Sequence, residues 1–190
     1  MAFDRDKIIK GVTLILEGVG EDPHREGLER TPERMVEYFE EVLSGTYQDP
    51  AVELRKYTTS NKDEMIIVKD ISFYSLCEHH ILPFFGKVHI AYIPQNDKVA
   101  GFDKMVKVVE ILSHRLQVQE RMTTEIADAM HEAIQPKGVL IVVEAEHLCL
   151  TMRGMKKPGN KIVTSAIRGI MRKDATRAEA LALLRGPQTH

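Results

Sequence analysis

The run from Val139 to Met152, VLIVVEAEHLCLTM, constrains the fold most, because five consecutive apolar residues lead into an alternating pattern. This composition predicts a buried strand. In a strand alternate side chains share a face, so His147 and Cys149 would point the same way, about 6–7 Å apart, with Leu148 toward the core. Taken alone, a His-x-Cys pair is more often a satisfied buried histidine beside an inert thiol. The strand therefore indicates a metal-competent face only if further ligands exist.

A second metal-competent segment is the run Cys77-Glu78-His79-His80. Thiolate and imidazole ligands together suit Zn²⁺. Cys77 and His80 are three positions apart, so a turn in this segment would direct both side chains to one point. The plain alternative is a polar loop with one buried thiol.

Together, Cys77, His80 and Cys149 would supply three protein ligands to a zinc ion. That number leaves the fourth tetrahedral position for water, which is typical of catalytic rather than structural zinc. Another alternative is a structural zinc protein, which would normally offer four ligands. The same donors also accept Fe²⁺ or Co²⁺. His79 and His147, close but unligated, are then candidates for proton transfer.

The remaining pattern predicts an α+β fold with antiparallel strand pairs and two helices between them. Helices are expected at 5–18, 31–43, 103–112, 118–134 and 176–184, and strands at 65–74, 87–93, 139–152 and 162–168. Thr31 is expected to cap the second helix, and Pro83 and Gly86 to separate the first two strands. We expect residues 1–45 to form a helical N-terminal arm and residues 46–190 the catalytic domain.

Charge and hydropathy exclude several classes of partner. Lys plus Arg is 26 and Asp plus Glu is 28, which argues against a nucleic-acid-binding surface. No stretch approaches the roughly 20 apolar residues of a membrane span, and no signal-peptide core follows the N-terminus. We therefore expect no nucleic-acid or membrane partner and a cytoplasmic location. The two cysteines are more often thiols, metal ligands or nucleophiles than a disulfide in that compartment.

Several motifs in register, spread over about residues 5–186, resemble one known family. They are Leu76–His80, Arg115–Arg121, His147–Cys149 with Met152–Gly154, Asp22–Leu28, Arg30–Arg34, Ala91–Pro94 and Thr164–Ala166. In this order they are similar to the GTP cyclohydrolase I family. The resemblance implies a tunnelling fold, in which an antiparallel sheet backed by two helices joins its neighbours into a barrel. It also implies a homo-oligomer, a decamer of two pentamers with active sites between subunits.

The activity implied by the resemblance is zinc-dependent opening of the guanine imidazole ring of GTP. Formate is released, and rearrangement gives 7,8-dihydroneopterin triphosphate, the first step of pterin and tetrahydrofolate synthesis. The family pattern assigns Cys77, His80 and Cys149 to zinc. It assigns His147 to protonation of a guanine nitrogen and His79 to later proton transfers.

The substrate contacts follow from the same resemblance. Glu120 would accept hydrogen bonds from guanine N1–H and the 2-amino group, a pattern that adenine lacks. Gln119 matches a second base contact; without the family, both would be taken as a solvated helix start. The positions that match triphosphate ligands are Arg34, Lys104, Lys107 and Arg153. For these cations the alternative is surface solvation.

Three positions depart from the family pattern at the phosphate end. Asp103 stands where a phosphate-contacting Ser is common, which places a carboxylate near the triphosphate. Lys107 replaces an Arg and loses its bidentate fork. Glu37 stands where some members carry a basic residue. Basic residues at 156, 157 and 161 could compensate; otherwise the substrate is another nucleotide, the reaction stops early, or the protein is a non-catalytic pterin- or purine-binding member.

Overall fold

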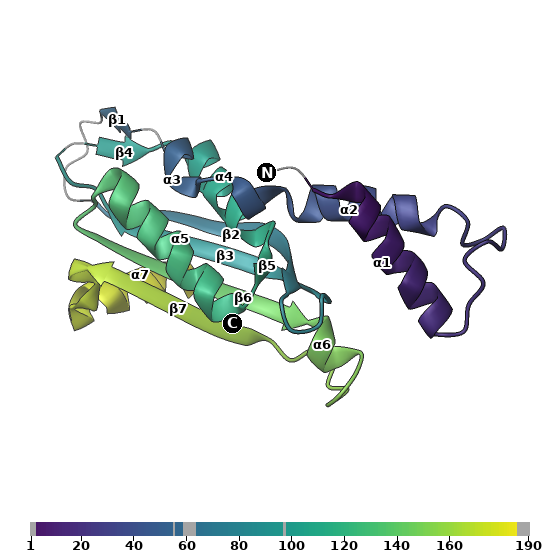
Figure 1. Cartoon of the computed structure of the whole chain (residues 1–190). Helices are drawn as coiled ribbons and strands as arrows, with labels where there is room; N and C mark the ends of the chain where they lie inside the picture. The colour runs from purple at the N-terminus through teal and green to yellow at the C-terminus, as the bar shows by residue number, and fades with distance from the viewer. Residues whose placement is uncertain (1–2, 55, 59–63, 97, 186–190) are drawn as a thin grey trace.

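A five-stranded sheet in the order β5-β2-β3-β6-β7 forms the centre of the molecule (Figure 1). The computed structural model describes residues 3–54, 56–58, 64–96 and 98–185. The strands of the sheet are β2 (Ile66–Cys77), β3 (Pro83–Ile93), β5 (Leu116–Gln117), β6 (Gly138–His147) and β7 (Ile162–Gly169). All pairs are antiparallel except β2 with β5, which is parallel. The predicted antiparallel α+β class is confirmed.

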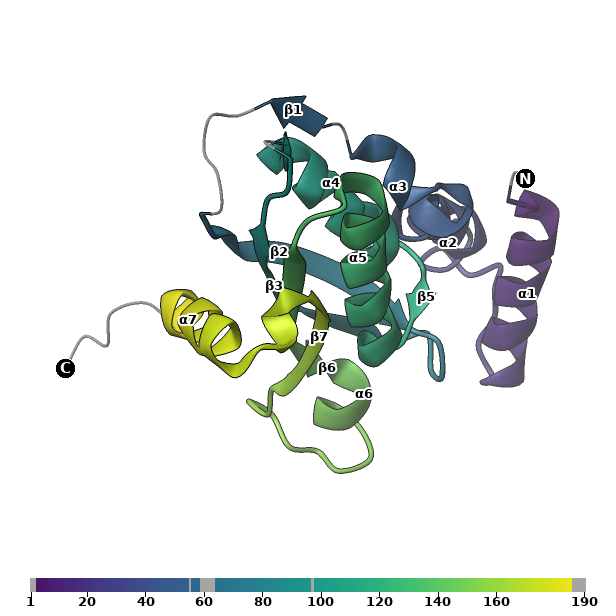
Figure 2. The ribbon, with the colours of Figure 1, turned by 90° about the vertical axis from the view of Figure 1, so that its left-hand side faces the viewer.

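Two helices cover one face of this sheet, and a third lies on the other face (Figure 2). The first two are α4 (Phe102–Ser113) and α5 (Gln119–Ile134). In α5, Met122, Ile126 and Met130 are fully buried at a spacing of four, which turns one helical stripe toward the sheet. On the opposite face α7 (Asp174–Arg185) follows η2 (Ile170–Arg172). The sheet is thus backed by two helices, as expected.

The N-terminal helices form an arm beside the sheet. α1 (Arg5–Gly18) and α2 (Thr31–Val42) contact each other; α2 also contacts β2, whereas α1 lies away from the sheet in Figure 1. The chain then continues through η1 (Ser44–Tyr47), α3 (Pro50–Glu53), β1 (Lys56–Thr58) and β4 (Lys98–Ala100), which pairs with β1. The predicted boundary between the arm (1–45) and the catalytic domain (46–190) stays a prediction. Residues 1–2 of the arm and 186–190 of the domain lie outside the described residues.

The predicted start of the second strand was wrong because Pro83 and Gly86 lie inside β3 rather than between the strands, and β2 also runs three residues further than predicted, to Cys77. Pro83 is the first residue of the strand, a position where the missing N–H is tolerated. A Cβ on Gly86 would lie 1.9 Å from the Glu144 carbonyl oxygen, so glycine there allows β3 and β6 to approach. The result is a longer β2–β3 hairpin, which carries the strand ends to the site described below.

The start of the second helix also differs from its prediction. Thr31 is the first helical residue rather than the cap, and Arg30 precedes it without a side-chain cap. The short elements α3, β1, β4 and β5 were not predicted, since segments of two to four residues carry too little periodicity. Within the described ranges no helix is both long enough and apolar enough to cross a membrane.

Candidate functional site

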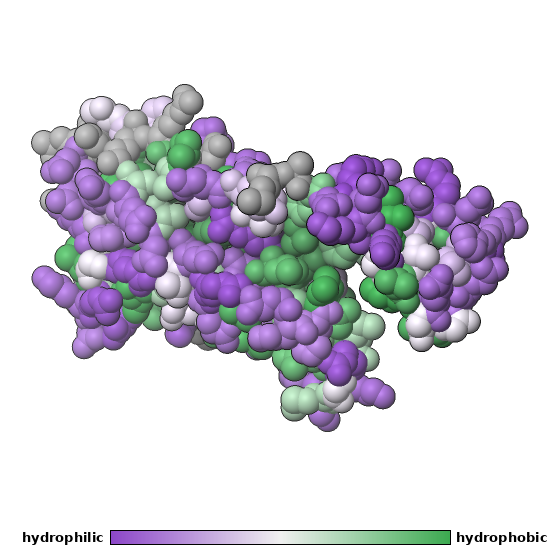
Figure 3. All heavy atoms as spheres, viewed as in Figure 1, coloured by the Kyte–Doolittle hydropathy of each residue, from purple (hydrophilic) through white to green (hydrophobic). Residues whose placement is uncertain are grey.

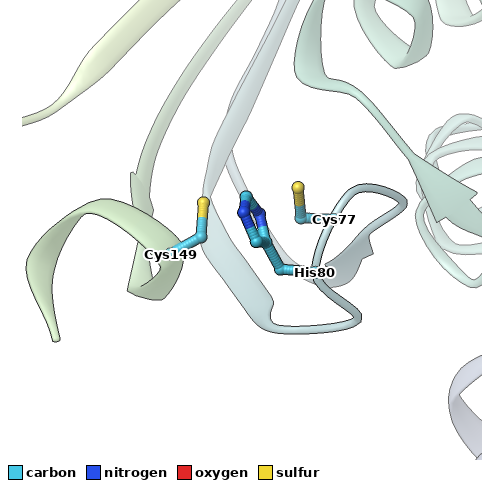
Figure 4. Close-up of side chains that lie close together, drawn as sticks. All are labelled: Cys77, His80 and Cys149. Carbon is cyan, nitrogen blue, oxygen red and sulfur yellow. The ribbon is translucent and has the colours of Figure 1, made fainter. Parts of the chain in front are cut away.

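Three side chains with soft or borderline donor atoms converge at one end of the sheet (Figure 4). Cys77 is the last residue of β2, His80 lies in the loop that follows, and Cys149 comes from α6 (Leu148–Thr151). One donor atom from each lies within 4.8 Å of the others. Cys77 is buried, Cys149 half-buried and His80 exposed, so the group is open on one side. It can hold a metal ion.

The turn after β2 places His80 beside Cys77. The carbonyl oxygen of Cys77 accepts hydrogen bonds from the N–H groups of His80 (3.3 Å) and Ile81 (2.8 Å). The N–H of Cys77 donates to the carbonyl oxygen of Leu82 at 2.9 Å, which closes the hairpin. Ile81 adopts the left-handed conformation, φ 55°, to complete this curl. The predicted turn therefore explains why a spacing of three brings a thiol and an imidazole together.

Cys149 reaches the site by a different route from the one predicted. The strand ends at His147, and residues 148–151 form α6, so His147 and Cys149 do not share a strand face. The alternation of apolar residues continues past the end of the strand, so the sequence pattern did not indicate the helix. The short helix buries none of its residues and therefore has no helical apolar pattern of its own. The chain bend directs Cys149 toward Cys77 and His80.

The local electrostatics suit a bound cation. Burial raises the pKa of the Cys149 thiol, the Cys77 sulfur raises it further, and Arg153 acts in the opposite direction. Two sulfurs this close resist ionisation when no cation lies between them, whereas a dication deprotonates coordinating thiols. The donor set of two thiols and one imidazole fits Zn²⁺.

His147, the last residue of β6, lies beside this group and is held by two buried neighbours. Its ring stacks on Phe84, with centroids 4.6 Å apart and planes inclined by 6°. Its Nε2 is 2.8 Å from Oε1 of Gln119, which is itself 1% exposed. Burial lowers the pKa of His147, and the negative charge of the nearby Glu120 acts in the opposite direction. Phe84 was not predicted as a site residue; its position directly after Pro83 carried no polar signal.

His79 stands at the open edge of the site. Its Nδ1 is 3.8 Å from the Cys77 sulfur, and its Nε2 is 3.9 Å from the Glu78 carboxylate. Arg121 donates to the same carboxylate at 2.5 Å and lowers the pKa of Glu78. These exposed interactions of His79, Glu78 and Arg121 connect the loop after β2 to α5, and the sequence did not predict them.

The predicted substrate residues divide into two groups. Gln119 and Glu120 are the first two residues of α5, next to His147, and Glu120 is exposed. Arg153 follows α6 and lies close enough to lower the pKa of Cys149. These three lie with the metal-binding group.

The other predicted cations lie elsewhere in the same chain. Lys104 is near the start of α4, which follows β4 at the end of the sheet opposite α6 (Figure 1). Its Nζ is 3.5 Å from the Asp103 carboxylate, and the Nζ of Lys107 is 2.9 Å from that of Glu110. Arg34 is exposed in the first turns of α2 in the arm. One chain alone therefore does not assemble the predicted triphosphate contacts beside the metal group.

Fold and site together describe an α+β protein in which a histidine and a carboxylate lie beside three donors that can hold a metal ion. The chain belongs to the GTP cyclohydrolase I family, whose pattern matches residues 8–185. It is 56% identical over 182 residues to GTP cyclohydrolase 1 of Carboxydothermus hydrogenoformans, covering 95% of both chains. It is 55% identical to GTP cyclohydrolase 1 of Pelotomaculum thermopropionicum, covering 97% of this chain and 98% of the relative.

The apo archaeosine synthase QueF-Like aligns with a TM-score of 0.45 and 16% identity, covering 57% of this chain and 97% of that one.

Proposed function

We propose that this protein catalyses the GTP cyclohydrolase I reaction, in which hydrolysis opens the imidazole ring of GTP, formate leaves and 7,8-dihydroneopterin triphosphate forms. The observation that carries the proposal is the meeting of Cys77, His80 and Cys149, from segments about 70 residues apart, beside His147 and Glu120. Membership of the family supports it. Three metal donors, a histidine that can transfer a proton and a carboxylate that can accept hydrogen bonds from guanine thus lie in one region of one chain.

Zinc is the metal we propose for this group. Cys77, His80 and Cys149 would hold it, and the exposed side of the group would admit substrate and water. When bound, zinc supplies Lewis acidity and makes water a usable nucleophile near neutral pH. The protein contributes the fixed donor positions: a hairpin closed by backbone hydrogen bonds holds two of them and the chain bend after β6 holds the third.

The residues of the site that do not bind the metal would bind and protonate the guanine base. The exposed carboxylate of Glu120 accepts from N1–H and the 2-amino group of guanine, which selects guanine over adenine. His147, held by Phe84 and Gln119, delivers a proton to an imidazole nitrogen of the base. His79, at the open edge, is placed for the later proton transfers of ribose opening and ring closure.

The triphosphate end of the site requires a second copy of the chain. A helix rises about 1.5 Å per residue, so Lys104 lies roughly 14 Å along α4 from Ser113 at the end nearer Cys77. Lys104 and Lys107 would therefore meet the triphosphate of a neighbouring subunit's site. This supports a homo-oligomer, and we propose the decamer of two pentamers.

The open edges of the sheet suit the same assembly. β7 forms one edge, and β2 has a ladder partner on its other side only at Leu76 and Cys77 among the described residues. Large apolar side chains are exposed near the metal end and on the arm: Tyr74, Ile81, Leu116, Met152, Leu14 and Ile15. Figure 3 shows apolar atoms gathered about the notch between arm and sheet. Edges and apolar patches of this kind are normally covered by partner strands or subunits.

Substrate choice tests the proposed activity. Zinc-loaded protein is incubated separately with GTP, ITP, which lacks the 2-amino group, and ATP, and products are analysed by mass. We expect pterin triphosphate from GTP, slower turnover of ITP and none of ATP. A formamidopyrimidine as the final product from GTP would mean that the reaction stops early, and equal turnover of ATP would remove Glu120 as the selecting residue.

Subunit complementation tests the shared site. The variant Lys104→Ala with Lys107→Ala and the variant His147→Ala are purified, then dissociated and reassociated as a mixture. If each site draws these residues from two chains, random mixing regenerates about one quarter of the wild-type sites. No recovery, with mixed oligomers confirmed by mass, would place both groups in one chain's site.

A further inference from the structure

We infer that Gln119 is a positioning residue that fixes the tautomer and the ring orientation of His147, so that Nδ1 is the nitrogen presented to the substrate. The catalytic meaning of this inference rests on the proposed function, but its structural content does not. It follows from a buried hydrogen-bond network between α5, β6 and β7. The directions of the hydrogen bonds in that network can be worked out from its acceptor-only members.

The network begins with two threonines. Thr123 Oγ1 lies 2.6 Å from the carbonyl oxygen of Gln119, which can only accept, so the Thr123 hydroxyl donates there. Thr123 Oγ1 also lies 2.7 Å from Thr164 Oγ1. Because the single Thr123 hydrogen is used, the Thr164 hydroxyl must donate to Thr123. Thr164 Oγ1 is then left as an acceptor.

The side-chain amide of Gln119 is oriented by what surrounds its nitrogen. Nε2 lies 3.1 Å from Thr164 Oγ1 and 3.0 Å from each of the carbonyl oxygens of Val143 and Ile162. All three neighbours are acceptors, so only the NH₂ end of the amide fits among them. A flipped amide would place its oxygen against three acceptors in a buried site, which is strongly unfavourable.

This orientation decides the state of the histidine. Oε1 of Gln119 faces His147 Nε2 at 2.8 Å and can only accept, so Nε2 must carry a hydrogen. The stacked Phe84 ring holds the plane of the imidazole. Within the described part of the chain His147 Nδ1 has no hydrogen-bond partner, and it is not one of the fully buried unpartnered side-chain atoms, so Nδ1 is not completely sealed from solvent. In the neutral ring Nδ1 carries the free lone pair, and it is the atom at which a proton is taken up or delivered.

The same network changes the role given to Gln119. The resemblance suggested a base contact, but the side-chain nitrogen and oxygen of Gln119 are both engaged by protein atoms, and the residue is 1% exposed. Glu120, exposed beside it, keeps its carboxylate available for guanine. Gln119 acts through His147, and Glu120 acts on the base.

The direct test is the tautomer of His147 by NMR of protein labelled with ¹⁵N only in histidine. Spectra are recorded at a mildly alkaline pH where histidine is neutral, and the His147→Asn variant identifies the resonances. We expect a protonated, pyrrole-type Nε2 and an unprotonated, pyridine-type Nδ1. The reverse pattern, or rapid averaging of the two nitrogens, would overturn the inference in the wild-type protein without any variant.

A matched pair of variants then tests the cause. Gln119→Met removes the acceptor at similar length, whereas Gln117→Met removes an equally buried glutamine that bonds Leu112, Glu125 and Arg121 instead. Gln119→Met is expected to lose the single tautomer and to lower kcat about 10- to 100-fold with little change in KM, as for other orienting partners. Gln117→Met is expected to lower the melting temperature without altering the His147 signals.

The outcomes separate the inference from the proposed activity. A single Nε2–H tautomer that survives in Gln119→Met would show that another group fixes the ring. Loss of the tautomer in both variants would show a general effect of packing, which also overturns the inference. If none of the proteins releases formate from GTP, the proposed function fails while the tautomer result still decides the role of Gln119 in orienting His147.

Discussion

Replacing Asp103 by Ser should improve the affinity of the protein for GTP. The Asp103 carboxylate lies 3.5 Å from the Lys104 Nζ, so it competes with the substrate for this cation and repels the triphosphate. Coulomb's law gives about 1.2 kcal/mol for unit charges at that distance in bulk water. Since 72% of the Asp103 side chain is exposed, the realised value is smaller, about 0.4–1 kcal/mol. Each 1.4 kcal/mol is a factor of ten, so KM should fall about 2- to 5-fold.

The assay is steady-state formation of the pterin from GTP at two ionic strengths. We expect kcat to stay within the wild-type range and the gain in affinity to shrink at high salt, because exposed charges are screened. The matched control is Asp174→Ser, which removes an acidic residue from the first turn of α7 that pairs with Arg177. Its KM should equal that of the wild type. An unchanged or raised KM for Asp103→Ser would refute the placement of α4 at the triphosphate.

Four further changes test other parts of the site. Cys149→Ser should lose zinc and formate release together, by metal analysis of gel-filtered protein; a zinc-replete, active variant would remove Cys149 from the ligands. His147→Ala should keep its zinc but release formate at least about 100-fold more slowly, and retained turnover would exclude it as the acid. Glu120→Gln should raise KM for GTP about 10- to 100-fold, because hydrogen bonds to a charged acceptor contribute about 1.5–3 kcal/mol; an unchanged KM would contradict its contact with the base. Gly86→Ala should lower the free energy of unfolding by about 1–3 kcal/mol or more in urea, as its Cβ would meet the Glu144 carbonyl oxygen; wild-type stability would show that β3 and β6 can separate.

The elements that bury a periodic face were predictable from the sequence. The helix predicted at 118–134 corresponds to α5, which buries the stripe of Met122, Ile126 and Met130, and the apolar run 139–143 predicted the centre of β6. The end of β6 was not predictable, because residues 148–152 continue the alternation although the chain bends at His147. The β2–β3 hairpin was predicted too short, since the role of Gly86 depends on Glu144, a residue 58 positions away.

The convergence of the three candidate metal ligands was predictable from donor chemistry, although the reason given for Cys149 was wrong. The chain has only two cysteines, so few combinations of thiol and imidazole ligands are possible, whatever the backbone between them. The surroundings of His147 were not predictable, because Gln119 and Thr164 are 45 residues apart and meet only through packing of α5 on β7. The positions of Arg34, Lys104 and Lys107 relative to a substrate remain proposals, because they rest on the proposed assembly of several chains.

The proposed activity can be measured by following formate and the pterin chromophore together while zinc-loaded protein turns over GTP. We expect both products to appear in equal amounts and removal of the metal to stop both. Formate without pterin would mean that the ring opens but the rearrangement fails. Neither product, from protein that holds zinc and is assembled, would contradict the proposed activity.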